Sequence, residues 1–501
     1  MDTRSASAHL QRELDLPPGS FKSDDSFIQK LATGAVATRR TFERLAAEGH
    51  DLVELERGSL SFKLWRKNIK RKRIRVPDLM CRRCGKRFES RGKTRVQISM
   101  SHSPTDGARA WNAGLAAGDV VTLVRVVPAE RPADFAADDL VQFINVNDLA
   151  RTADQAKLTA PKGATEGSEV QICWPARVAD EAGRVEEITD TAIRYRTHAG
   201  RRRTVQLTRR GAGPLIPMVA VGEEFPIGRI LASVAVVTTH CACAGGATNE
   251  TFLGTLTSLN LADRYASAKA LRHVNAAPIT DRLLDRMRDE REDIYVRLEA
   301  AASLLIHGNE EAREFFATVL EGEHDSFRLE AVIVLAEVKT SESTELLRWI
   351  LGNADVHPDI RGAAAWSIGE IGLDSANVAA LIGAFQVLDS EIRREAGRAL
   401  SKLARNFRAE VVTAFPAGDH ESQRPGIAWA LARAGVTVDE LLGTLTAEDN
   451  VRHWIAYMIG TQDRATMLAG MEALRARDPE VYFAVNVLWT ILESWIKGFD
   501  E

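Results

Sequence analysis

The stretch DIYVRLEAAASLL, residues 293–305, decides the fold of the C-terminal half, because it returns as DSFRLEAVIVL at residues 325–335. Each copy has an aspartate, an arginine a few residues later and a large aliphatic residue seven positions after the arginine. The intervals between successive arginines are 33, 31, 33, 32 and 59 residues, and the longest interval holds a degenerate copy around 426–435. A period of this length indicates stacked helical repeats. The six arginines are Arg264, Arg297, Arg328, Arg361, Arg393 and Arg452.

The repeated positions give one face of a helix small and large apolar residues in alternation, which suits close helix packing. The aspartates precede the arginines by one to four residues, where they are expected to cap the second helix of each pair. We expect the arginines to tie neighbouring repeats together. The pattern resembles the short HEAT repeats of bilin-lyase-type proteins from about residue 255 to 475. The resemblance implies an all-α HEAT solenoid over 251–501, closed by a helix at 479–499, with a protein partner or effector bound to it.

Composition places the whole chain among soluble multidomain proteins. Of 501 residues, 45% are hydrophobic and 27% charged, and this length corresponds to roughly three domains. The longest apolar run, Ile230–Val237, is far below the ~18 residues of a membrane helix, and the first thirty residues have no apolar signal-peptide core. We therefore expect a cytoplasmic protein without a membrane contact.

The residues before the repeats divide into three parts. A polar N-terminal extension covers 1–25, an α/β domain covers 26–158, and a small all-β module with glycine-broken strands covers 159–250. Within the α/β domain the pattern predicts a helix at 26–48, three strands, a helix at 108–117 and two further strands. The predicted fold class is therefore multidomain, with an α/β core, a β module and an all-α solenoid.

Charge is concentrated in one segment of the α/β domain. Residues 57–95 contain 16 Lys or Arg and two acids, a net charge of +14, while the whole chain has −4. Such a patch is typical of a polyanion contact, and an acid-free stretch at 192–222 with seven arginines is expected to extend it. The candidate nucleic-acid-binding residues are Arg66, Lys67, Lys70, Arg71, Lys72, Arg73, Arg75, Arg201, Arg202 and Arg203.

Two acids stand inside this basic segment, in or beside neighbouring predicted strands. Asp78 follows Val76-Pro77, Glu89 comes eleven residues later, and Lys93 shares a strand face with Glu89. Together with the element order, these residues resemble the PD-(D/E)xK core of restriction-endonuclease-like nucleases. The resemblance implies that Asp78 and Glu89 bind Mg²⁺ or Mn²⁺, and that Lys93 assists the attacking water. Arg91 stands where that family has its lysine.

The assignment of the remaining roles leaves alternatives open. Glu54 or Glu56 would supply a third metal-binding acid, and either Arg91 substitutes for the usual lysine or Lys93 replaces it. The resemblance implies a DNA phosphodiester hydrolase with a HEAT arm that recruits or senses a partner, in defence or repair. The alternative is a non-catalytic nucleic-acid-binding adaptor that kept the shape of a nuclease and lost its chemistry.

Four of the five cysteines form close pairs, Cys81/Cys84 and Cys241/Cys243. Cys81-x-x-Cys84-Gly85 has the spacing of a zinc knuckle, which supplies half of a tetrahedral site. If the β module folds back onto the α/β domain, the four thiolates would close a structural Zn²⁺ site. The other interpretation is two unrelated pairs of reduced thiols.

Overall fold

The computed structural model describes residues 24–55, 69, 74–159, 170–208, 213–418, 422–446, 448–462, 464–480 and 482–483. The chain forms two compact units, one within Met1–Leu60 and Lys72–Leu271 and the other within Ser61–Arg71 and Arg272–Glu501. Each unit is described here by itself. Most of the expected closing helix at 479–499 and the basic run at 66–73, except Ile69, lie outside the described residues.

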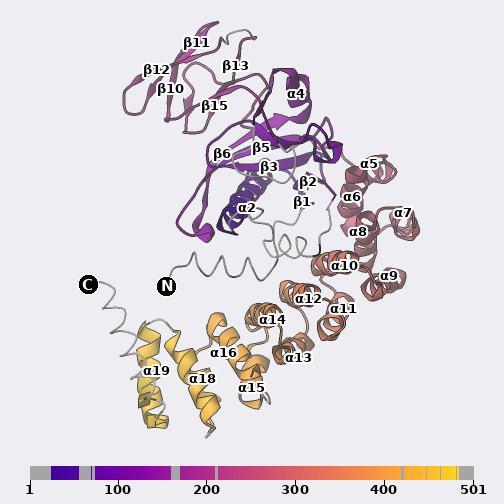
Figure 1. Ribbon diagram of the computed structural model, residues 1–501, viewed down its shortest axis with the longest axis vertical. Helices are drawn as coiled ribbons and strands as arrows, with labels where there is room; N and C mark the ends of the chain where they lie inside the picture. Colours follow the sequence, from indigo (N-terminus) through magenta and orange to yellow (C-terminus); the bar gives the residue numbers. More distant parts are fainter. Residues whose placement is uncertain are drawn as a thin grey trace, which may run out of the picture. The chain divides into compact units, whose positions relative to one another are not determined.

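The first unit is built on a mixed five-stranded sheet with one long helix across a face (Figure 1). The strand order is β1-β2-β3-β5-β6; β3 and β5 are parallel and the other neighbours antiparallel. The elements are α2 Asp24–Ala47, β1 Leu52–Glu54, β2 Leu79–Cys81, β3 Arg87–Lys93, β5 Val120–Val127 and β6 Ala136–Asn145. The helix and the first three strands thus follow the predicted order.

Helix α2 packs closely on the sheet because the strand residues facing it are small or apolar. A Cβ at Gly92 would lie 2.4 Å from the Thr33 carbonyl oxygen, so the helix backbone occupies that space. The Thr41 hydroxyl is 3.2 Å from the Ser90 hydroxyl and 3.0 Å from that of Thr122. Even-numbered residues of β3 therefore face α2, and odd-numbered residues face the other side.

That other side is covered by a core that continues into the β module. The core contains Ile98 and Val121 from the α/β part and Ile193 and Leu231 from the β module. The predicted boundary at 158 therefore lies inside one continuous core. The remaining strands are β4 Ser99–His102, β7 Lys157–Thr159, β8 Val170–Cys173, β9 Ala176–Val178, β10 Gly183–Ile188, β11 Ala192–Thr197, β12 Arg202–Gln206, β13 Ile216–Pro217, β14 Glu224–Phe225 and β15 Ile230–Ser233.

The helix predicted at 108–117 is absent, and this prediction was wrong. The chain makes one 3-10 turn at Gly107–Arg109 and then continues through turns to β5. Gly114 has φ +80°, and a Cβ there would lie 2.1 Å from the Arg75 carbonyl oxygen. Tertiary contact with the backbone at Arg75 thus outweighs the helix propensity of the alanines in this segment. The described part of the first unit also contains the short helices α4 Val146–Arg151, α5 Asn249–Thr255 and α6 Leu261–Ala270.

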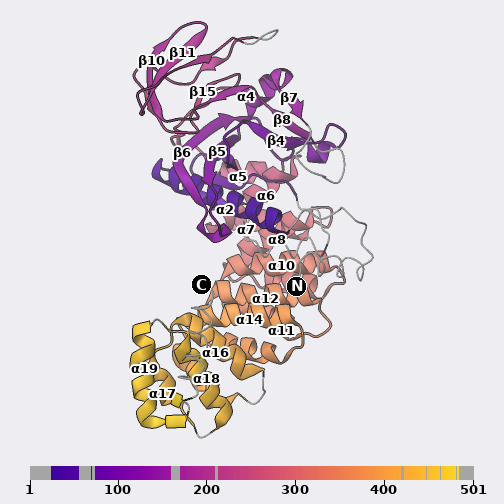
Figure 2. The same cartoon turned by 60° about the vertical axis from the view of Figure 1, so that its left-hand side comes forward.

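The second unit is all-helical, as the repeats predict (Figure 2). Its helices are α7 Ala277–Arg288, α8 Ile294–Leu305, α9 Glu310–Glu321, α10 Asp325–Val338, α11 Ser341–Gly352, α12 Pro358–Ile371, α13 Ala376–Gly383, α14 Ser390–Leu403, α15 Arg408–Ala417, α16 Gln423–Ala434, α17 Val438–Gly443, α18 Asp449–Gly460 and α19 Arg464–Arg477. The second helices α8, α10, α12, α14, α16 and α18 contact one another in succession. The repeat around Arg264, on α6, belongs to the first unit.

Three of the repeated arginines cap the preceding helix of their own repeat. Arg297 Nε donates to the Met287 carbonyl in the last turn of α7, at 2.8 Å. Arg328 Nε donates to Leu320 at the end of α9, and Arg361 Nε to Leu351 at the end of α11. Each bond satisfies a carbonyl that the helix end leaves without an intrahelical donor. These three arginines join the two helices of one repeat, whereas Arg452 on α18 bonds Asp478 after α19 and provides the expected link to the next helix pair.

The degenerate repeat contains the same arginine, which the sequence pattern missed. Arg424 Nη2 donates to the Pro416 carbonyl at the end of α15, and Leu431, seven residues later, is buried. No aspartate lies within the four residues before Arg424. Of the predicted aspartate caps, Asp293 and Asp389 accept from backbone N–H groups at the starts of α8 and α14. The others in the second unit lie in the first turn of their helices, such as Asp325 in α10.

Candidate functional site

The pairing of β2 with β3 brings Asp78 close to the start of a row of charged residues on β3. Leu79 pairs with Phe88 and Met80 with Arg87 in antiparallel register. Asp78 is the bend residue directly before β2, and continuing the register by one residue would set it across from Glu89. Arg91 and Lys93 follow Glu89 on the same face of β3, because strand residues alternate.

The two carboxylates already have partners within this row. Asp78 Oδ2 accepts a hydrogen bond from the Ser90 backbone N–H at 2.7 Å. Glu89 Oε1 lies 2.8 Å from Arg91 Nη2, and the Glu89 side chain is only 14% exposed. Arg91, at the position where the PD-(D/E)xK pattern has lysine, is thus an ion-pair partner of Glu89.

Lys93 is a half-buried amine at the end of the same row. Its Nζ donates to the backbone carbonyl and to the hydroxyl of Ser99, both at 3.0 Å. Burial lowers the pKa of Lys93 from 10.5 to about 8, and the positive charge of Arg91 lowers it further. A lysine with a pKa this close to neutrality can carry or release a proton under ordinary conditions.

The structure does not bring Glu54 to this face. Glu54 pairs with Leu79, one residue along from Asp78, so its side chain lies on the opposite side of the sheet. Glu56, the other candidate for a third acid, lies outside the described residues.

The described basic residues are mostly paired with acids. Arg75 is exposed and donates to the Ala110 carbonyl. In the β module, Arg201 and Arg203 pair with Glu181 at 3.0 and 2.9 Å, and Arg202 lies 3.7 Å from Glu186. The acids belong to β10 and the turn before it, outside the acid-free stretch. The expected extension of the basic surface is therefore partly neutralised.

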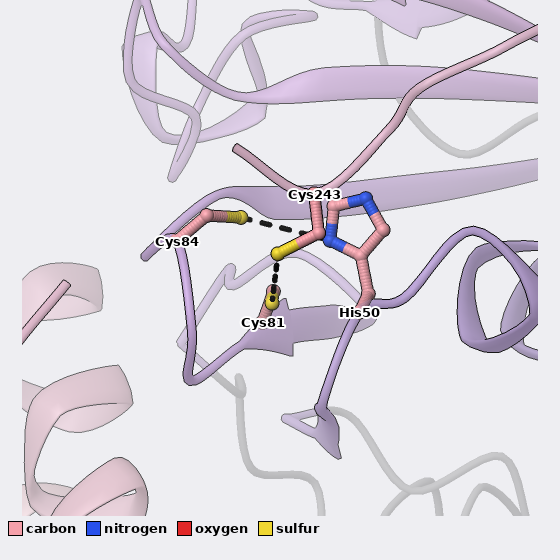
Figure 3. A group of neighbouring side chains, drawn as sticks. All are labelled: His50, Cys81, Cys84 and Cys243. Carbon is pink, nitrogen blue, oxygen red and sulfur yellow. Dashed lines mark hydrogen bonds between the residues drawn. The ribbon is translucent and has the colours of Figure 1, made fainter. Parts of the chain in front are cut away.

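A cysteine and histidine group lies at the other end of β2 (Figure 3). It contains His50, Cys81, Cys84 and Cys243, with ligand atoms within 4.8 Å of one another. The structure thus brings together three of the four predicted cysteines, from both pairs. Cys241 lies outside the group, and its carbonyl oxygen is 2.6 Å from His50 Nε2.

The sequence reasoning missed His50. A single histidine after Gly49, thirty-one residues before Cys81, has no metal-ligand spacing to mark it. The usable signal was structural: once the helix at 26–48 and the strand from Leu52 are placed, the turn between them carries His50 to the end of the sheet. Burial raises the pKa of the Cys84 thiol to about 12.

Comparison with known proteins identifies only the helical half. Residues 314–401 match the family model for HEAT repeats. The C-terminal half carries HEAT repeats. No curated protein is similar enough to this chain to count as a match. None of the helices in the described ranges has both the length and the apolar character of a membrane span.

Several solved structures resemble parts of the chain at low identity. Human deoxyhypusine hydroxylase with glycerol is 18% identical, over 44% of this chain and 85% of its own, with a TM-score of 0.19. The complex of CpcE and CpcF of phycocyanin lyase from Nostoc sp. PCC7120 is 18% identical over 47% and 98%, with a TM-score of 0.26. The karyopherin Kap121p, bound to the C-terminus of the phosphatase Cdc14p, is 12% identical over 42% and 29%, with a TM-score of 0.30. These scores say nothing about what the present chain binds.

Proposed function

We propose that the chain is a Mg²⁺- or Mn²⁺-dependent hydrolase of nucleic-acid phosphodiesters, DNA in the first instance, with a HEAT array that binds a protein. The observation that supports the proposal is the hydrogen bond from the Ser90 N–H to the Asp78 carboxylate, which puts Asp78 beside the residue that follows Glu89. Carboxylate oxygens are the ligands that a hard divalent cation prefers. The nuclease assignment otherwise rests on the resemblance of the sequence motif.

In this proposal the row along β3 divides the work. Asp78 and Glu89 would hold the cation, and the cation would supply polarisation of the water and of the scissile phosphate. Arg91 would contact the phosphate, where its fixed charge would stabilise the transition state. Lys93, with its lowered pKa, orients the water and exchanges a proton with it.

One observation favours the alternative of a non-catalytic nucleic-acid-binding adaptor. The 2.8 Å ion pair between Arg91 and Glu89 neutralises one of the two carboxylates. If that pair stays closed, a cation has only Asp78 to bind, and the basic segment would hold nucleic acid without cutting it.

Cleavage by the full-length protein separates the two proposals. Supercoiled plasmid, linear duplex and single-stranded DNA are incubated at low salt with Mg²⁺ or Mn²⁺, and with EDTA as the blank. We expect Asp78→Asn to lose at least 100-fold in rate with DNA binding unchanged, because asparagine can still accept from the Ser90 N–H. Asp138→Asn, which alters a carboxylate paired with Arg125, is the control and should retain activity.

The outcomes assign the function directly. Metal-dependent cleavage that disappears in Asp78→Asn supports the hydrolase. Salt-sensitive binding without cleavage in every variant supports the adaptor. Absence of both binding and cleavage rejects both proposals.

The protein-binding role of the array rests on the HEAT repeats and on exposed apolar side chains. Stacked repeats present an extended surface suited to protein partners. Trp349 and Leu388 are 43% and 95% exposed. The full-length protein is labelled by oxidative footprinting in buffer and in an extract of the cells from which it comes. A bound protein partner should lower the oxidation of both side chains in the extract. Equal oxidation in buffer and extract would contradict this role.

A further inference from the structure

We propose that His50, Cys81, Cys84 and Cys243 bind one structural Zn²⁺ ion. The four ligands come from three separate parts of the first unit: the turn after α2, the β2–β3 turn, and the segment 239–247 that follows the β module. Figure 3 shows the three sulfurs and the imidazole pointing toward one another. The proposal is independent of the hydrolase, whose acids lie at the opposite end of β2.

Two of the six distances among the four ligand atoms match a tetrahedral zinc site, and all six are within 4.8 Å. With Zn–S bonds of about 2.3 Å and Zn–N bonds of about 2.0–2.1 Å, a tetrahedron separates two sulfurs by about 3.8 Å and a sulfur from a nitrogen by about 3.6 Å. Cys81 Sγ and Cys243 Sγ are 3.8 Å apart. Cys84 Sγ and His50 Nδ1 are 3.6 Å apart. The donor set of three thiolates and one imidazole is one that structural zinc sites use.

The imidazole is held in the orientation that a ligand requires. His50 is buried, and its ring packs edge-on against Phe88 with centroids 5.2 Å apart. Its Nε2 lies 2.6 Å from the Cys241 carbonyl, to which it donates. This leaves the Nδ1 lone pair directed at the cysteines, the arrangement by which a backbone carbonyl fixes the tautomer of a metal-bound histidine.

The backbone turn after β2 brings two of the cysteines together. Gly85, at φ +71°, allows the tight turn after Cys84, and its N–H donates to the Cys81 carbonyl at 2.8 Å. A turn of this kind, with two cysteines three residues apart, supplies half of a tetrahedral zinc site.

The site would fasten the segment 239–247 to the α/β sheet. Cys241 N–H donates to Glu48 Oε2 at 2.6 Å, and Ala247 N–H donates to the Arg83 carbonyl at 3.0 Å. Hydrogen bonds therefore place this segment beside the knuckle, and the ion would lock it there. Because four protein ligands fill the tetrahedron, no position stays open for substrate, which is the mark of a structural site.

The test is the zinc content of full-length protein purified without chelator, with cysteine variants matched in chemistry. We expect about one zinc per chain in the wild type and in Cys241→Ser and Cys173→Ser. Cys84→Ser and Cys243→Ser should lose most of it. His50→Cys should keep zinc, because a fourth thiolate replaces the imidazole, whereas His50→Ala should bind it more weakly.

A second measurement covers variants that do not fold. Replacing zinc by Co²⁺ in the wild type should give the intense visible absorption of tetrahedral, thiolate-bound cobalt. Absence of zinc from the wild type, equal loss of zinc in Cys241→Ser and Cys243→Ser, or an intact mass showing a Cys81–Cys243 disulfide would each overturn the proposal. DNA cleavage by purified wild-type protein that contains no zinc would also overturn the zinc site. That result would leave the proposed roles of Asp78 and Glu89 unchanged.

Discussion

Arg87 of the first unit and the repeat arginines of the array are held in different ways. Arg87 makes two hydrogen bonds to Asp119 and one to Asp263, at 2.8–2.9 Å, across 32 and 176 residues of sequence. In the array, Arg297 and Arg361 bond backbone carbonyls only ten residues away. Arg87 therefore joins distant parts of the chain through charge, as Arg272 does in the array with Glu299 and Glu337, whereas the repeat arginines make a short-range bond from helix to helix.

The difference has energetic consequences. Arg87 and Asp119 are 6% and 5% exposed, so removing one leaves the other as an unpaired charge with little water. In the array, removing the arginine leaves a neutral carbonyl without one donor, a much smaller cost. Substitution of Arg87 should therefore cost more than substitution of a repeat arginine that caps a helix.

The largest effect is expected for Arg87→Met. This change leaves Asp119 buried without its cation and should lower the free energy of unfolding of the first unit by about 3–5 kcal/mol. Chemical denaturation followed by near-ultraviolet circular dichroism of the buried pair Trp111 and Trp174 measures it. Arg125→Met, which removes a partly exposed pair with Asp138, is the control and should cost about 1 kcal/mol or less. Equal decreases in the free energy of unfolding for Arg87→Met and Arg125→Met would show that burial of the Arg87–Asp119 pair adds no stability.

A smaller effect, dependent on pH, is expected at Lys93. Its pKa falls from 10.5 to about 8 on folding, so the folded chain binds this proton more weakly than the unfolded chain. Above pH 10.5 the amine is neutral in both states, and the free energy of unfolding is at its highest. As the pH falls toward 8, only the unfolded chain takes up the proton, so the free energy of unfolding falls by about 1.4 kcal/mol per pH unit, or ~3 kcal/mol in all.

Lys93→Met should abolish this pH dependence. Unfolding free energies of wild type and variant, measured between pH 7 and pH 10.5, should therefore converge as the pH rises. Lys157→Met, at an exposed strand position, should keep the wild-type slope. An unchanged slope in Lys93→Met would show that another group carries it.

The smallest effect is expected for Arg361→Met in the array. The Leu351 carbonyl loses a donor, which should cost about 1–2 kcal/mol and act locally. Hydrogen exchange should become faster at the end of α11 and the start of α12. Arg282→Met, whose side chain is 67% exposed, should leave exchange unchanged. If Arg361→Met lowered the free energy of unfolding as much as Arg87→Met, the expected difference between a helix-capping arginine and Arg87 would be wrong.

The same contrast explains what the sequence could predict. The repeats were visible because the positions of Arg297 and Leu304 recur at a fixed interval, and the structure confirms an all-helical unit there. Arg424 was nevertheless missed, because the sequence pattern required an aspartate shortly before the arginine. Helix α16 has Ser422, and no aspartate, at its N-terminal cap position.

Prediction was weaker in the first unit because its decisive contacts are long-range. Nothing local to 108–117 reveals that Gly114 must leave room for the Arg75 carbonyl. Likewise, the cysteine spacing pointed to Cys241, whereas the fold supplies His50, 191 residues away from it. The nuclease motif and the zinc site stay predictions until the measurements above are made.

The position of Asp263 and Tyr265 on α6 has a consequence for synthesis on the ribosome. Arg87 needs Asp263, and the Tyr265 hydroxyl donates to the Leu55 carbonyl across 210 residues. The sheet leaves the exit tunnel long before these partners are translated, so the first unit must wait, incompletely paired, until α6 emerges. In the repeats that follow, the capping bonds of Arg297, Arg328 and Arg361 can form as each repeat appears, because each arginine comes within ten residues after its carbonyl. We therefore expect chaperone dependence to concentrate in the first 270 residues.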